Sequence, residues 1–117
     1  MPSTTLADLQ AMIVNFRRQR DWEQFHNPKD MALGLALEAA ELMELVHWRQ
    51  GAELADHLKT NRQALADELA DLLGWILLFA EDHQINLATA FKNKMKKNRA
   101  KYPIQKARGR HTKYTEL

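Results

Sequence analysis

Cysteine does not occur in the chain, and its absence excludes several kinds of site. Without thiols there can be no disulfide framework, no zinc–thiolate centre and no cysteine nucleophile. Glycine and proline are also scarce, with four Gly and three Pro, which argues against collagen-like and turn-rich β architectures. The composition is otherwise that of a globular protein, 45% hydrophobic and 27% charged, and 117 residues correspond to a single domain.

Long apolar segments are absent as well. The longest strongly apolar run, residues 72–80, has nine residues, whereas a membrane-spanning helix needs about 20. The first ten residues, MPSTTLADLQ, lack the basic start and apolar centre of a secretory signal. We therefore expect a soluble, cytoplasmic protein with no membrane partner.

Charge is distributed unevenly along the chain. Before Lys92 there are 7 Lys/Arg and 14 Asp/Glu, a net charge of −7, and from Lys92 onward there are 10 Lys/Arg and one acid, a net charge of +9. A basic end of this kind is typical of a nucleic-acid-binding or membrane-binding arm. It equally suits a protein that brings cations to a phosphorylated small molecule, or a simply solvated helix and tail.

Four segments have the periodicity of amphipathic helices, namely 4–20, 27–50, 60–83 and 87–101. Asn27 followed by Pro28 predicts the start of the second helix, and Gly51 its end. Residues 51–59 then form a polar linker with room for a short helical turn, and Thr60 with Gln63 predicts a capping box. Asn86 caps the last helix.

No strand-like alternation occurs, so we expect an all-α fold, a four-helix bundle. Residues 104–117 lack any period and predict an extended basic tail after a domain formed by residues 1–103.

Two acid pairs, Glu38/Glu41 and Glu68/Asp71, carry most of the functional information. Each pair is spaced i,i+3, so its members share one face of a helix. On a helical wheel these faces coincide with the apolar stripes of the second and third helices. A buried, unpaired carboxylate costs several kcal/mol at least. The acids therefore either lie at a solvated edge or surround a divalent cation.

The nature of these ligands selects among metals. An all-oxygen set suits hard cations, Mg²⁺ first and Mn²⁺ second, and Mg²⁺ couples readily to phosphates. A di-iron bundle would need two Glu-x-x-His pairs, and only Glu44 with His47 fits that pattern.

Aromatic and basic residues flank the acid pairs. Trp48 follows Glu41 by seven residues and Trp75 follows Asp71 by four, so both indoles lie near the acid faces; such aromatics form either core or a base-stacking pocket. We expect His26, His47 and His83 at the surface or at helix caps. Lys94, Asn98 and Lys101 share one face of the last helix, where cations could reach a phosphate chain.

These motifs resemble a known family. LALEAAELMELVHW followed by DELADLLGWILL is similar to the MazG-like, all-α nucleotide pyrophosphohydrolases, with their E-x-x-E and E-x-x-D helices. RDWEQFHNPKD, KNKMKKNRAKYP and the terminal KYTEL, in the same order, resemble the dCTP pyrophosphatase branch. Two positions depart from the family pattern: Leu37 stands where many members have an acid, and Trp75 where Tyr is frequent.

The resemblance implies Mg²⁺-dependent hydrolysis of a nucleoside triphosphate, dCTP or a modified dCTP, to the monophosphate and pyrophosphate. It implies that Mg²⁺ is held by Glu38, Glu41, Glu68 and Asp71. As a mechanism, we expect Glu38 or Glu41 to act as the general base that takes the proton of the attacking water. It further implies a substrate site formed by Phe16, Trp22, Glu23, Trp48, Trp75, Lys94, Asn98 and Tyr102. Tyr102 and residues 113–117 would close over the site, from the same or from another subunit.

A homo-oligomer is expected on two grounds. The second and third helices are apolar around much of their circumference, and a chain of this length has little other surface to cover them. The family resemblance implies a tetramer built from two tight dimers, so we expect a dimer at minimum.

Two alternatives remain open from the sequence. A related all-α pyrophosphohydrolase with dUTP, broad NTP or phosphoribosyl-ATP specificity would share the acid-pair scaffold. A basic-tailed nucleic-acid-binding or antitoxin-like protein would bind DNA through residues 104–117. The second alternative leaves the acid pairs unexplained, so nucleic acid is not an expected partner.

Overall fold

The computed structural model describes residues 3–117, and every regular element in them is helical. The elements, in chain order, are α1 (Leu6–Gln19), η1 (Glu23–Phe25), α2 (Pro28–Val46), α3 (Gly51–Thr60), α4 (Arg62–Asp82), α5 (Leu87–Lys101), α6 (Ile104–Ala107) and η2 (Tyr114–Glu116). The predicted all-α class is thus confirmed. None of the helices in this part of the chain has both the length and the apolarity to cross a membrane.

The chain forms two compact units, one up to Gln84 and one from Ile85 to Leu117. The first contains α1 to α4, and the second contains α5, α6 and η2. The charge changes sign near the same boundary, because Lys92 and the cations after it all belong to the second unit.

Local capping explains most of the helix starts. Thr5 and Asp8 form a capping box at the start of α1, each side chain bonding the other's backbone N–H. Asn27 accepts from the backbone N–H of Asp30, with Pro28 as the first residue of α2. Asn86 accepts from the N–H of Thr89 at the start of α5. The predicted caps at Asn27 and Asn86 are confirmed.

The connection between α2 and α4 differs from the prediction. Helix α2 ends at Val46, not at residue 50, because the next residue, His47, has an extended backbone and Trp48 has a φ of +69°, neither of which a helix allows. Gly51 does not terminate α2 but is the first residue of α3, so the predicted polar linker is a helix. Its Leu54 and Leu58 are half-buried and lie one turn apart.

The capping box expected at Thr60 does not form. Thr60 is the last residue of α3, and α4 begins after Asn61. The Gln63 side chain donates to Asp67 at 2.8 Å instead. The amide of Asn61 donates to the carbonyl of His57 at 2.9 Å, so it satisfies the end of α3.

The C-terminal segment is not extended, contrary to expectation. It contains α6 and η2, and within its own unit Tyr114 lies edge-on to Tyr102 with ring centroids 5.9 Å apart. The ammonium group of Lys101 lies 4.6 Å from the Tyr114 ring centroid, a cation–π contact. These two contacts attach residues 113–117 to the end of α5.

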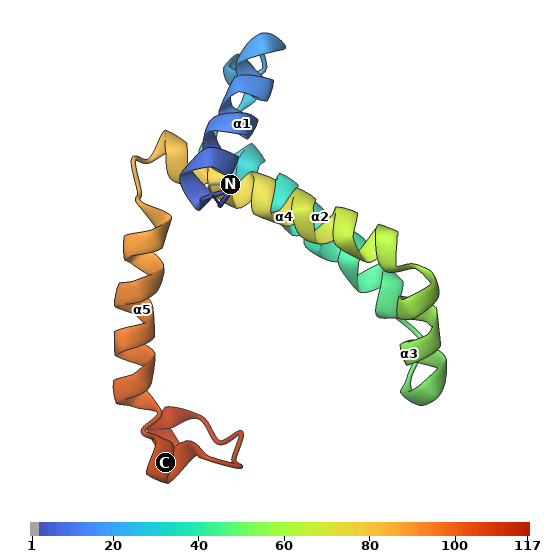
Figure 1. Ribbon diagram of the computed structural model, residues 1–117, viewed down its shortest axis with the longest axis vertical. Coiled ribbons are helices and arrows are strands. Elements are labelled where there is room, and N and C mark those ends of the chain that lie inside the picture. Colours follow the sequence, from blue (N-terminus) through green and yellow to red (C-terminus); the bar gives the residue numbers. More distant parts are fainter. Residues whose placement is uncertain (1–2) are drawn as a thin grey trace. The chain divides into compact units, whose positions relative to one another are not determined.

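Helices α2 and α4 lie side by side in the first unit, and α1 packs on α4 (Figure 1). The centre of this packing is formed by Val14, Met31 and Leu78, one buried residue from each helix. Gly74 permits the close approach of α1, since a Cβ atom there would lie 2.8 Å from Cδ1 of Ile13. Helices α2 and α4 run antiparallel (Figure 1), and this pairing brings glutamates from both helices close together.

Arg17 and Asp82 form a partly buried ion pair between α1 and the end of α4. Two guanidinium nitrogens donate to the two carboxylate oxygens at 2.7 and 2.9 Å, a bidentate geometry that fixes both groups. The Arg17 residue is only 5% exposed. Hydrogen bonding to Arg17 lowers the pKa of Asp82, which stays ionised in the pair.

Candidate active site

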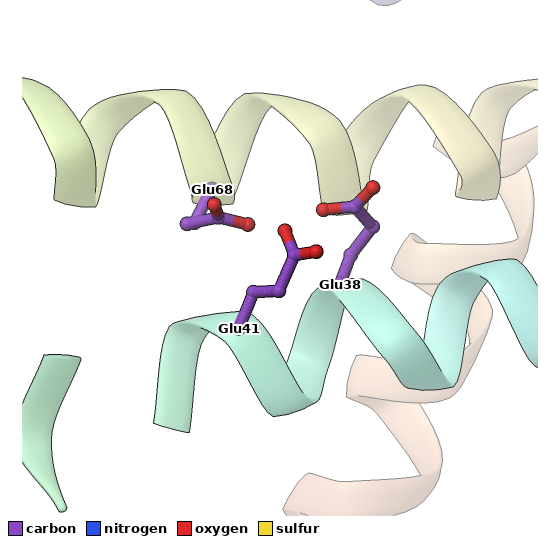
Figure 2. Close-up of side chains that lie close together, drawn as sticks. All are labelled: Glu38, Glu41 and Glu68. Atoms are coloured by element: carbon purple, nitrogen blue, oxygen red, sulfur yellow. The ribbon is translucent and has the colours of Figure 1, made fainter. Parts of the chain in front are cut away.

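Three glutamates from two helices converge in the first unit. Glu38 and Glu41 project from α2 toward α4, and Glu68 projects from α4 toward them (Figure 2). Each offers a carboxylate oxygen, and these oxygens all lie within 4.8 Å of one another. Glu38 and Glu68 are half-buried, whereas Glu41 is exposed. We call these three residues the glutamate cluster.

The glutamate cluster is electrostatically unsatisfied. One carboxylate oxygen of Glu38 and one of Glu68 are buried without a hydrogen-bond partner. Burial, together with the neighbouring carboxylates of Glu68, Glu41 and Asp71, raises the pKa of Glu38 to about 7. Burial also raises the pKa of Glu68, and the charges of Glu41 and Asp71 add to this effect. Such crowding of like charges requires either protons or a cation.

The cluster fits a hard divalent cation. Its donors are carboxylate oxygens alone, the ligands that Mg²⁺ and Mn²⁺ prefer. The two buried oxygens without partners are free to serve as ligands. No histidine belongs to the cluster in the described residues, so the set lacks the nitrogen ligands of a di-iron bundle.

Asp71, the fourth predicted metal ligand, lies one turn after Glu68 on α4. It does not belong to the group of converging oxygens, although its charge acts on both Glu38 and Glu68. Asp71 instead lines an adjacent cavity. Asp71 therefore lies between the glutamate cluster, on which its charge acts, and this cavity, which it lines.

This cavity has a volume of about 230 Å³ and is mainly aromatic and aliphatic, so we call it the aromatic cavity. Its lining residues are Ile13, Phe16, Arg17, Trp22, His26, Ala70, Asp71, Gly74, Trp75 and Leu78. The Phe16 and Trp22 rings meet edge-on with centroids 5.7 Å apart. Three predicted substrate residues, Phe16, Trp22 and Trp75, are thus brought together beside the predicted metal ligand Asp71.

Other predicted residues lie elsewhere in the first unit. Trp48 is 92% exposed and contacts the His47 ring at 4.3 Å between centroids, so within one chain it does not line the aromatic cavity. Glu23 lines a different cavity with Arg17 and Asp82, and its carboxylate lies 3.8 Å from Nε of Arg18.

Lys94, Asn98 and Tyr102 belong to the second unit. Lys94 is exposed, Asn98 is half-buried, and the Asn98 carbonyl accepts from the backbone N–H of Tyr102 at 2.8 Å. Their roles in substrate binding stay predictions.

Sequence reasoning missed two polar residues of the aromatic cavity, Arg17 and His26. His26 is the C-terminal cap of η1, as expected, but its half-buried ring also lies 5.3 Å from the Trp75 ring. Its Nδ1 lies 3.5 Å from Nη1 of Arg17; a guanidinium can only donate, so Nδ1 is the acceptor in this contact. Burial, and then the Arg17 charge, lowers the pKa of His26. Arg17 could have been identified from the sequence, because it lies one turn after Ile13 on the apolar face of its helix.

Comparisons with known proteins agree with this geometry. The MazG-like family profile matches residues 34–117. The chain is 38% identical to dCTP pyrophosphatase 1 of Rattus norvegicus and to that of Homo sapiens, in each case over 99% of this chain and 69% of the relative. A crystal structure of a pyrophosphatase from Archaeoglobus fulgidus superposes with a TM-score of 0.80 and 32% identity, covering 88% of this chain and 96% of that one. The chain belongs to the MazG-like family.

Proposed function

We propose that this protein is a nucleoside triphosphate pyrophosphohydrolase. It cleaves deoxynucleoside triphosphates, dCTP or a modified dCTP in preference, to the monophosphate and pyrophosphate, and so removes unwanted nucleotides from the pool. The observation that carries the proposal is the glutamate cluster beside the aromatic cavity in a MazG-like chain. The similarity to mammalian dCTP pyrophosphatase 1 supports the choice of base.

The proposed cofactor is Mg²⁺, with Mn²⁺ as a substitute. Glu38, Glu41 and Glu68 would hold it, and Asp71 is the proposed fourth ligand at the cavity edge. When bound, a divalent cation supplies charge neutralisation of the triphosphate and an acidified water.

The remaining chemistry belongs to the chain's own residues. Glu38 or Glu41 would take the proton of the attacking water as a general base. Phe16, Trp22 and Trp75 would bind the base between aromatic surfaces. Glu23 and Trp48 are proposed to bind the nucleoside, and Lys94 and Asn98 the phosphate or sugar. Tyr102 is proposed to cover the bound substrate. Each of these residues can be tested singly by its effect on KM.

Pyrophosphate release from a panel of nucleotides tests the proposed function. With Mg²⁺ present, we expect pyrophosphate from dCTP and 5-substituted dCTP, and little from dUTP or phosphoribosyl-ATP. Equal cleavage of dUTP would favour the broader all-α pyrophosphohydrolase. No pyrophosphate from any nucleotide, by a folded protein, would contradict the proposal.

The proposed assembly is a homo-oligomer, a dimer at minimum and a tetramer formed as a dimer of dimers. Large apolar side chains are exposed on α2 at Leu33 and Leu37, 52% and 65%, and on α4 at Leu69 and Ile76, 51% and 38%. Packing of these surfaces between two copies would bury them and complete a four-helix bundle. A cytoplasmic location, and closure of residues 113–117 over a site in a neighbouring subunit, stay predictions.

Sedimentation tests the assembly. We expect wild-type protein at micromolar concentration to sediment as a dimer or larger. Leu37→Lys should shift it toward monomer, because a charge would be buried in the proposed interface. Glu44→Lys introduces the same side chain at an exposed polar position of α2 and serves as the control. A wild-type monomer at micromolar concentration would contradict the assembly.

A further inference from the structure

Gly34 of α2 lies directly against the indole of Trp75, which belongs to α4 and lines the aromatic cavity. A Cβ atom at residue 34 would lie 2.8 Å from both Cε2 and Cζ2 of Trp75, and 3.2 Å from Cη2. Carbon atoms in favourable contact are about 3.5–4.0 Å apart. Any side chain at residue 34 therefore requires a shift, either of the indole or of the α2 backbone.

The surroundings of Trp75 limit the direction of that movement. The indole packs on the core formed by Val14, Met31 and Leu78. Its ring also lies 5.3 Å from the His26 ring, centroid to centroid. The aromatic cavity is the open space that adjoins Trp75. Because the side chains of a close-packed core have little room to move, an indole displaced from α2 would enter the cavity and reduce its volume.

We infer that Gly34 is a positioning residue for substrate selection. Because it has no side chain, the Trp75 indole can pack directly against α2, and the aromatic cavity stays large enough for the nucleobase. Gly34 does not line the cavity and acts only through Trp75. The inference rests on the proposed function, which assigns the cavity to the base. The bases most affected by a smaller cavity are bulky ones, such as pyrimidines substituted at C5.

A first experiment follows the indole itself, without substrate or metal. In a background with Trp22→Phe and Trp48→Phe, Trp75 is the only tryptophan, and acrylamide quenching reports its exposure. We expect Gly34→Ala to increase quenching, because the indole moves into the cavity. Glu44→Ala is the matched control for this readout, since Glu44 is an exposed residue of the same helix and does not line the cavity. Unchanged quenching in Gly34→Ala would overturn the inference.

A second experiment measures kinetics with otherwise wild-type protein. We expect Gly34→Ala to raise KM about 10- to 200-fold for 5-substituted dCTP, the range for one misplaced group in an apolar pocket, and less for dCTP. The kcat at saturation should change little, because the glutamate cluster keeps its place. Ala is also the better helix former, so the variant should fold, and thermal melting would verify this.

A double mutant distinguishes a displaced Trp75 indole from a general disturbance of α2. Phenylalanine at residue 75 lacks the indole carbons that Gly34 contacts, so adding Gly34→Ala to Trp75→Phe should change KM by less than about twofold, within the error of additivity. If Gly34→Ala instead lowers kcat and metal affinity at constant KM, with no rescue, α2 has moved and the inference is wrong. If no variant or wild type cleaves any nucleotide, the proposed function fails, while the quenching result still decides the role of Gly34.

Discussion

Glu38→Gln is expected to lower metal-dependent pyrophosphate release by about 10³-fold or more, because it removes both a proposed ligand and a proposed general base. Gln preserves the size of the side chain, so the α2–α4 packing should remain. The metal-free variant should melt at a higher temperature than wild type, since one of the crowded carboxylates is gone. Coupled pyrophosphate assays and circular dichroism measure the two effects.

Glu44→Gln is the matched control for this substitution. Glu44 lies on the same helix, is exposed, and does not belong to the glutamate cluster. We expect its activity and melting temperature to equal those of wild type. Wild-type turnover in Glu38→Gln, or an equal loss in Glu44→Gln, would eliminate the glutamate cluster as the active site.

The stability of the metal-free protein should fall as pH rises toward 7. The pKa of Glu38 is about 7 in the folded chain and near 4.5 ordinarily. Between these pH values the folded chain retains a proton that the unfolded chain has lost, so the free energy of unfolding decreases with pH. The stabilising contribution is complete below about 4.5 and is lost as the pH passes about 7. Thermal melting in EDTA at pH 6 and pH 8 measures this difference.

Addition of Mg²⁺ should reverse this pH dependence. A cation replaces the proton among the carboxylates, so it should stabilise the protein more at pH 8 than at pH 6. An ion at 100 times its Kd contributes about 2.7 kcal/mol, which raises the melting temperature of a small domain by several degrees. Glu38→Gln should weaken both the pH effect and the Mg²⁺ effect. Identical Mg²⁺ shifts at the two pH values would contradict proton displacement.

Helix starts were predictable where the signal is local. Asn27 and Asn86 cap α2 and α5 through bonds to residues three positions away, and such short-range geometry can be read from sequence. The segment of α3 was predicted only as a linker with room for a short helical turn, since it has just two large apolar residues, Leu54 and Leu58. The early end of α2 depends on the left-handed backbone of Trp48, a residue with no preference for that conformation.

The acidic residues of the candidate site could be predicted from the sequence, whereas the positions of the residues around them could not. The i,i+3 spacing identified Glu38 with Glu41, and the antiparallel α2–α4 pairing adds Glu68 to them. The bidentate pairing of Arg17 with Asp82 joins residues 65 positions apart, and such a contact depends on tertiary packing rather than on spacing. Trp48 has the expected spacing but lies after the end of α2, so its indole is exposed in a single chain.

Anomalous diffraction from crystals soaked in Mn²⁺ is the most direct test of the central claim, that the glutamates of α2 and α4 hold a catalytic divalent ion. The account predicts a manganese peak bonded to carboxylate oxygens of Glu38, Glu41 and Glu68, and no peak there in crystals of Glu38→Gln. A fully active wild-type protein whose manganese binds elsewhere, with these three carboxylates free of metal, would contradict it.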